Sequence, residues 1–190
     1  EHYPNDIVTE KLQDIATSLA IFSAFTEGVQ IFSSFAVLLS FQKKNLMKGV
    51  GQIVSFSVRD ETIHSQGGIY LFNTLCDEFP FLRQKCQEKV FNAAELTYTL
   101  EKNFIDSCFQ LGDVRTISKE QLVEFIKHRI NIQLRNLGYT DLFEVNTNLI
   151  EEMNWFYDLS VGKEFGDFLA TRGTVTEYSK VEKFDADNMW

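Results

Sequence analysis

Two residues of a predicted helix, Glu61 and His64, have the types and the spacing of metal ligands. Residues three apart on an α-helix project from one face, so a carboxylate oxygen and an imidazole nitrogen can reach the same metal ion. Another carboxylate, Glu27, falls within the apolar stripe of the preceding predicted helix. Because a buried carboxylate without a partner is costly, we expect a metal, an arginine or a hydrogen-bond network beside Glu27.

Together these residues would supply half of a dinuclear metal site. In carboxylate-bridged bundles, two helices each contribute a Glu-x-x-His pair and two others each contribute a single glutamate. The chain offers one such pair, Glu61 and His64, and one suitable single glutamate, Glu27. The sequence therefore predicts a half-site whose remaining ligands come from elsewhere.

Each of these residues also has a simpler explanation. Glu61 and His64 could lie on a solvated helix face, and Glu27 could form a structural ion pair with Arg59. Asp60 diverges from its neighbour Glu61 by about 100° on a helix, so it cannot readily bind the same metal. It could instead accept the free N–H of a metal-bound histidine, or form a surface ion pair.

The remaining histidines and the cysteines carry no recognisable site. His2 and His128 have no carboxylate at ligand spacing and are predicted to be ordinary surface or capping residues. Three cysteines at irregular spacing, Cys76, Cys86 and Cys108, match neither a zinc ribbon nor a redox pair. We expect reduced thiols and a cytoplasmic protein.

Composition narrows the class of protein further. The net charge of −9 makes nucleic acid and anionic membranes poor partners. No apolar run approaches the roughly 20 residues that a membrane-spanning helix needs. With only 2 prolines and a hydrophobic content of 44%, the chain of 190 residues is predicted to be an all-α domain with a substantial core.

Four helices are expected, over about residues 6–41, 50–79, 83–111 and 118–138. The glycine pair at 67–68 would allow close backbone approach, and Ser118 with Gln121 forms a capping box. The predicted buried rows are Leu12, Ile15, Leu19 and Phe22, continuing through Glu27, Ile31 and Phe35, in the first helix; Val90, Ala94, Leu96, Leu100, Phe104 and Phe109 in the third; and Leu122, Phe125, Ile126, Ile130 and Leu134 in the fourth. The second helix has a row with a polar centre, formed by Ile53, Ser57, Glu61, His64, Gly68 and Leu71. Residues 1–158 would form the helical bundle and residues 159–190 a flexible tail.

Several short sequence segments, in the same order along the chain, resemble the small subunits of class I ribonucleotide reductases. They are Ala24-Phe25-Thr26-Glu27-Gly28-Val29, Ser33-Ser34-Phe35-Ala36, Arg59-Asp60-Glu61-x-x-His64, Asn131-Ile132-Gln133-Leu134 and Val175-Thr176-Glu177-Tyr178-Ser179-Lys180. The resemblance implies a ferritin-like helical bundle. It also implies a dinuclear centre of two Fe, or of Mn and Fe, that generates a radical for a large subunit that reduces ribonucleotides to deoxyribonucleotides.

The resemblance also implies roles for particular residues. Glu27, Glu61 and His64 would be metal ligands, and Asp60 would hydrogen-bond a histidine ligand of the other metal and help to conduct the radical. Tyr178 would relay the radical to the large subunit. The segment from Phe184 to Trp190 would dock on that subunit.

The first half of such a subunit, with an aspartate, another Glu-x-x-His and the usual radical-bearing tyrosine, has no counterpart in this sequence. We therefore expect the C-terminal half of a split small subunit, completed by a separate N-terminal half chain in a higher-order oligomer. Two alternatives remain open. The chain could be a non-catalytic assembly or regulatory subunit that binds the large subunit, or two copies could face each other and build one dinuclear site.

Overall fold

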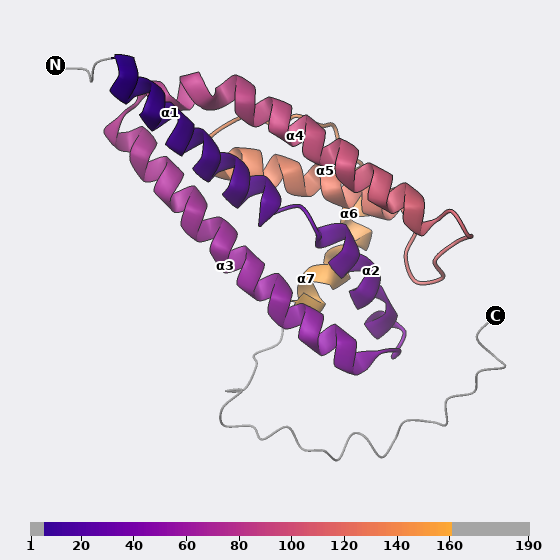
Figure 1. The fold of residues 1–190 in the computed structure, drawn as a ribbon. Helices are drawn as coiled ribbons and strands as arrows, with labels where there is room; N and C mark the ends of the chain where they lie inside the picture. The colour runs from indigo at the N-terminus through magenta and orange to yellow at the C-terminus, as the bar shows by residue number, and fades with distance from the viewer. Residues whose placement is uncertain (1–5, 161–190) are drawn as a thin grey trace, which may run out of the picture.

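The computed structural model describes residues 6–160, which form a helical bundle without a strand in that range (Figure 1). The helices are α1 (Asp6–Ile21), the π-helix η1 (Phe22–Thr26), α2 (Phe32–Lys43), α3 (Lys48–Glu78), α4 (Phe81–Cys108), α5 (Lys119–Asn136), α6 (Thr147–Glu152) and α7 (Asn154–Ser160). The all-α prediction is confirmed. The predicted tail, with Tyr178, Phe184 and Trp190, lies outside the described residues.

Helix α1 lies between the two longest helices, α3 and α4, and α5 packs behind the break between α1 and α2 (Figure 1). The buried row of α1 consists of small residues, Ala16, Ala20 and Ala24, all with no exposed surface. Small side chains let neighbouring helix backbones approach closely, so this row allows α1 to fit between its two long neighbours.

The fourth predicted helix is confirmed as α5, down to its ends. The Ser118 hydroxyl accepts the Gln121 amide at 3.1 Å, and the Gln121 side chain accepts the Ser118 amide at 2.9 Å, which completes the capping box. After α5, Gly138 adopts a φ of +82°, the left-handed conformation that commonly ends a helix. The predicted buried row of this helix is buried throughout.

The single long helix predicted over residues 6–41 is wrong, because the chain breaks between residues 22 and 31. The amide of Glu27 bonds to the carbonyl of Phe22 at 3.0 Å, and that of Gln30 to Phe25 at 2.8 Å. Bonds that span five residues define a π-helix, which inserts one extra residue into the turn. Ile31 then takes a φ of +68° before α2 begins.

Two of the predicted buried rows are also corrected. In the first helix Ile15 is 53% exposed and Phe22 57% exposed, because the alanine row faces the core instead. In α4 the buried row is Val90, Ala94, Thr97, Glu101 and Ile105, whereas Leu96, Leu100 and Phe104 are exposed. Both errors arose because large apolar residues were assigned to the core in preference to small or polar ones at the correct helical spacing.

Two further properties concern the class of protein. Within residues 6–160, none of the helices is long and apolar enough to span a membrane. Cys76, Cys86 and Cys108 are free thiols, as predicted.

Candidate metal centre

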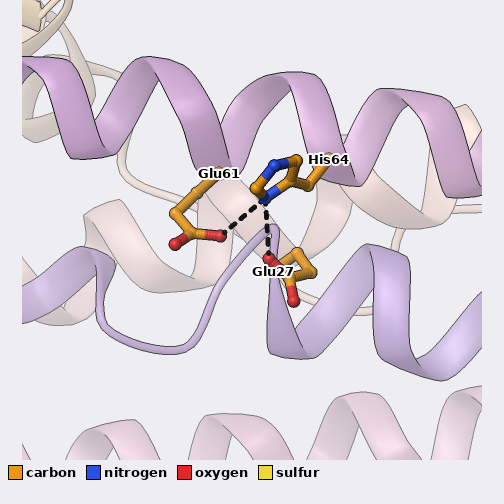
Figure 2. Close-up of side chains that lie close together, drawn as sticks. All are labelled: Glu27, Glu61 and His64. Atoms are coloured by element: carbon orange, nitrogen blue, oxygen red, sulfur yellow. Dashed lines mark ion pairs between the residues drawn. The ribbon is translucent and has the colours of Figure 1, made fainter.

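The structure brings together Glu27, Glu61 and His64, the three residues predicted as ligands (Figure 2). Glu61 and His64 project from one face of α3, and Glu27 reaches them from the end of η1 (Figure 2). The Nδ1 atom of His64 lies 3.6 Å from a carboxylate oxygen of each glutamate. One donor atom from each residue falls within 4.8 Å of the other two, so a single ion could contact all three.

Within the described residues, the imidazole of His64 is the only basic side chain at ion-pair distance from either carboxylate. Hydrogen bonding to Glu27 raises the pKa of Glu61, and burial and the charge of Glu27 raise it further, while His64 lowers it. Two carboxylates this close favour sharing a proton or binding a cation. The simpler alternative for Glu27 is not supported, because no ion pair joins it to Arg59 within the described residues, and Arg59 is exposed.

The π-helix explains why Glu27 reaches this group. In a regular continuation of α1, Glu27 would follow the row of Ala16, Ala20 and Ala24 into the core, since residues three, four and seven apart share a face. The extra residue of η1 rotates the next residues of the chain by about 100°. The Glu27 side chain is 18% exposed and lies beside His64.

A close approach between η1 and α3 sets the distance across the group. A Cβ atom added to Gly68 would overlap the side chain of Ser23, so a glycine is required where the two helices meet. The close approach predicted for the glycine pair is thus confirmed at Gly68 only. A Cβ at the neighbouring Gly67 would meet nothing within 4 Å, because that position faces outward.

The group is exposed on one side, a surface that we call the open face. The His64 side chain is 62% exposed. Ile53 and Leu71 share its side of α3, at helical spacings of 11 and 7 residues, and are 68% and 52% exposed. On α1 and η1, exposed Ile15 and Phe22 line a hollow with Asp14, Ser18 and Leu19. The open face thus consists of apolar rows on either side of the carboxylates.

Two further residues with roles predicted from the sequence, Asp60 and His128, lie on α3 and α5. Asp60 is exposed on α3, with no ion pair among the described residues, so its predicted role is neither supported nor contradicted. His128 is half-buried, with an Nδ1 atom that has no partner, so the prediction of an ordinary surface or capping residue is wrong.

Two buried charged residues beside the helix break, Arg129 and Glu101, were missed by the sequence analysis. Arg129 lies on the buried face of α5, three positions after Ile126 and next to Ile130 in the sequence. Glu101 lies four positions after Thr97 and four before Ile105 in the buried row of α4. A charged residue in register with a buried row was the signal that could have found both.

A bundle that presents two carboxylates and an imidazole from adjacent elements belongs, in architecture and donor type, with the dinuclear carboxylate proteins. The donors fit first-row divalent metals, since carboxylate oxygen suits Mn and imidazole nitrogen suits Fe. The sequence matches the family described as ribonucleotide reductase, small chain, over residues 2–149. The chain belongs to this family.

Relatives and a solved structure agree with this assignment. The chain is 37% identical to ribonucleoside-diphosphate reductase small subunit 048L of Invertebrate iridescent virus 3, over 89% of this chain and 44% of that protein. It is 28% identical to the beta subunit of the ribonucleoside-diphosphate reductase of Chlamydia pneumoniae, over 90% of this chain and 47% of that protein. It thus spans about half the length of these relatives.

The fold comparison extends the agreement to structure. A structure described as a class I ribonucleotide reductase from Bacillus halodurans matches with a TM-score of 0.65 and 19% identity, covering 80% of this chain and 60% of that one. At this identity the match concerns the fold alone. The predicted ferritin-like bundle is confirmed.

Proposed function

We propose that this chain forms the C-terminal half of a ribonucleotide reductase small subunit and supplies half of its dinuclear metal centre. The observation that carries the proposal is the convergence of Glu27, Glu61 and His64 on an exposed face. An ion-pair network of purely structural use would be expected to balance its own charge, whereas this group combines two carboxylates with a single imidazole.

The apolar rows of the open face support the second part of the proposal, that further helices complete the centre. Ile15, Phe22, Ile53 and Leu71 all expose more than half of their surface. Contiguous exposed apolar surface commonly marks an interaction site. We propose that a complementary N-terminal half, carried on a partner chain, covers these rows and brings the remaining ligands.

The completed centre would hold two Fe, or Mn and Fe, with Glu27, Glu61 and His64 as ligands. When bound, the metals would supply the oxygen-dependent oxidation that creates a radical. In this chain, Glu27 and Glu61 would neutralise the charge of the metals, and the imidazole of His64 would fix a nitrogen donor. Asp60, exposed next to Glu61, would accept the N–H of a histidine on the completing helices.

The C-terminal segment, outside the described residues, would connect this centre with the large subunit. We propose that Tyr178 relays the radical and that Phe184 and Trp190 anchor the segment, since aromatic residues within an acidic peptide give specific docking. The reduction of ribonucleotides would then take place on the large subunit, in the cytoplasm.

The test is metal analysis of the small subunit assembled from this chain and its complementary half. Glu61→Ala should abolish metal uptake, because it removes one ligand and the partner of Glu27. Glu78→Ala, an exposed carboxylate at the end of the same helix, is the matched control and should leave the metal content unchanged. Full metal loading of Glu61→Ala would refute the role of this residue.

The same preparation separates the alternatives. One dinuclear site per two copies of this chain, with no other protein present, would indicate a centre built by a homodimer. An assembled subunit that binds metal and the large subunit but yields no radical would indicate an assembly or regulatory role. Deletion of residues 184–190 distinguishes docking from chemistry, because it should abolish binding of the large subunit and leave metal uptake intact.

A further inference from the structure

The break between η1 and α2 frees backbone polar groups that need partners in the interior. The amide of Phe32 bonds to the carbonyl of Val29 at 3.1 Å, so it does not bond to Gly28 as it would in a regular helix. Gly28 is itself buried. A buried carbonyl without a partner is costly, and this one directly follows Glu27.

Arg129 satisfies the Gly28 carbonyl from α5. Its Nε and Nη2 atoms donate to the Gly28 oxygen at 3.0 and 2.6 Å, and Gln133 adds a weaker bond at 3.3 Å. The guanidinium also stacks on the ring of Phe32, 3.5 Å from its centroid. Among the described residues no carboxylate pairs with Arg129.

The charge on Arg129 is retained although the side chain is only 8% exposed. Burial lowers the pKa of Arg129 to about 10, which still leaves it a cation at neutral pH. Two N–H donors of this buried cation meet the Gly28 carbonyl, which makes a strong, charge-assisted contact. That contact fixes the peptide group immediately after Glu27.

Glu101 holds the other side of the break from α4. Its carboxylate accepts the hydroxyl of Ser33, and the backbone amides of Ile31 and Ser33 also bond to it. Burial raises the pKa of Glu101, and these three hydrogen bonds lower it without outweighing burial. An anion suits this position, since the first amides of α2 are free and the helix dipole is positive there.

The two contacts match the backbone groups that they hold: a guanidinium meets the Gly28 carbonyl within the break, and a carboxyl group meets the amides of Ile31 and Ser33 where α2 begins. The backbone between them is in a costly state, because Ile31 is β-branched and adopts a φ of +68°. Something outside the segment must therefore hold the break against reversion to continuous helix.

We propose that Arg129 and Glu101 are positioning residues that hold the break between η1 and α2 and so orient Glu27 toward Glu61 and His64. The orienting role rests on the proposed metal centre, whereas the holding of the break does not. Neither residue contacts the metal ligands themselves; both act through the backbone of residues 28–33.

Hydrogen exchange of the full chain tests the holding of the break without any metal. Arg129→Met and Glu101→Gln should each speed exchange of the amides of residues 29–35 by about ten-fold or more relative to the other helices. Leu82→Ala is the matched control, because Leu82 is fully buried at the distant start of α4. It should lower global stability without a local effect at the break. Unchanged relative exchange in residues 29–35 in both variants would overturn the proposal.

Titration with Co²⁺ alone tests the orienting role. Arg129→Met should weaken Co²⁺ binding to the chain assembled with its complementary half by about ten-fold, but should have no further effect in a Glu27→Gln background, since a residue that acts only through Glu27 cannot add to its loss. Leu82→Ala, assayed at a temperature where it is folded, should bind Co²⁺ as the unmodified chain does. Additive losses would overturn the orienting role.

Failure of a variant to fold and failure of the proposed metal centre give different results in these experiments. If Arg129→Met fails to fold by circular dichroism, Glu101→Gln carries both measurements from the other side of the break. If the unmodified chain, assembled with its complementary half, binds no Co²⁺, the proposed metal centre fails. The exchange experiment then still decides whether Arg129 and Glu101 hold the break.

Discussion

Two groups of charged residues flank the same helix break and differ in how their charges are satisfied. Arg129 and Glu101 are buried, and each bonds to backbone groups of the break, with the Ser33 hydroxyl as a further partner of Glu101. Glu27, Glu61 and His64 lie near the surface, and their closest charged partners are one another. Buried charges that are hydrogen-bonded to the backbone fix its conformation, whereas adjacent carboxylates on an open surface can bind a cation.

The apolar residues divide in the same way between a closed interior and the open face. Phe156 has no exposed surface and packs on Phe125 and Phe32, with ring centroids 4.8 and 6.2 Å away. Phe22, on the open face, is 57% exposed. The same residue type therefore stabilises the described bundle at one position and remains exposed at the other.

Truncation of these two phenylalanines should give the largest difference between the regions. Phe156→Ala removes a fully packed ring and should lower the free energy of unfolding by about 3–5 kcal/mol. Phe22→Ala should cost about 0.5 kcal/mol or less in the isolated chain, because its ring has few partners to lose. Urea denaturation of both variants measures the difference.

Phe22→Ala should nevertheless weaken assembly with the complementary half, since the exposed ring would be buried there. Co-sedimentation of the two halves at matched concentrations measures this effect. Equal destabilisation of the isolated chain by the two truncations would contradict the distinction between a closed interior and an open face.

The same change at two glycines should give effects of opposite sign. A Cβ at Gly28 would overlap the Ala24 carbonyl and the Gln133 side chain, so Gly28→Ala should destabilise the chain by about 1–3 kcal/mol. Gly67 lies within α3 with open space around it. Gly67→Ala should therefore stabilise the isolated chain by about 0.5–1 kcal/mol, through helix propensity alone. Thermal unfolding reports both signs.

Gly67→Ala could stabilise the isolated chain and at the same time weaken its assembly with the proposed complementary half. That combination would indicate that the glycine is kept for close approach by a partner helix. Destabilisation of the isolated chain by Gly67→Ala would show that this position is already packed.

Much of the bundle follows from local rules that the sequence displays directly. The capping box of Ser118 and Gln121 fixed one helix start correctly, and helical spacing alone paired Glu61 with His64. These features depend on residues three or four apart, whose relation within a helix does not depend on the rest of the fold.

The break at residues 22–31 could not be found in this way, because distant residues hold it. Arg129 is 101 positions from the Gly28 carbonyl that it contacts, and Glu101 is 68 positions from Ser33. The exposure of Ile15 and Phe22 was missed for a related reason. Large apolar residues are typical of a core, and only the packed structure reveals that α1 turns its alanines inward and leaves Ile15 and Phe22 exposed.

The smallest expected effect is on the pH dependence of stability, and it comes from one of the two described histidines. These two also differ in burial. His64 lies exposed between two carboxylates, whereas His128 on α5 is half-buried with an unpartnered Nδ1 atom. Burial lowers the pKa of His128 below its ordinary value of 6.5, and the charges of Arg135 and Arg129 lower it further. The imidazole of His128 therefore binds a proton more weakly in the folded chain than in the unfolded chain.

The sign of the pH dependence is set by this difference. Above the unfolded pKa of about 6.5, His128 is neutral in both states and its burial is fully compatible with folding. As the pH falls through 6.5 toward the lowered folded pKa, the unfolded chain gains a proton first, so the free energy of unfolding decreases. His128→Gln should remove this contribution, and its stability should fall less steeply than that of the unmodified chain between about pH 7 and pH 5. Parallel urea titrations across this range measure the two slopes, and identical slopes would mean that the proton reaches His128 in the folded bundle as easily as in the unfolded chain.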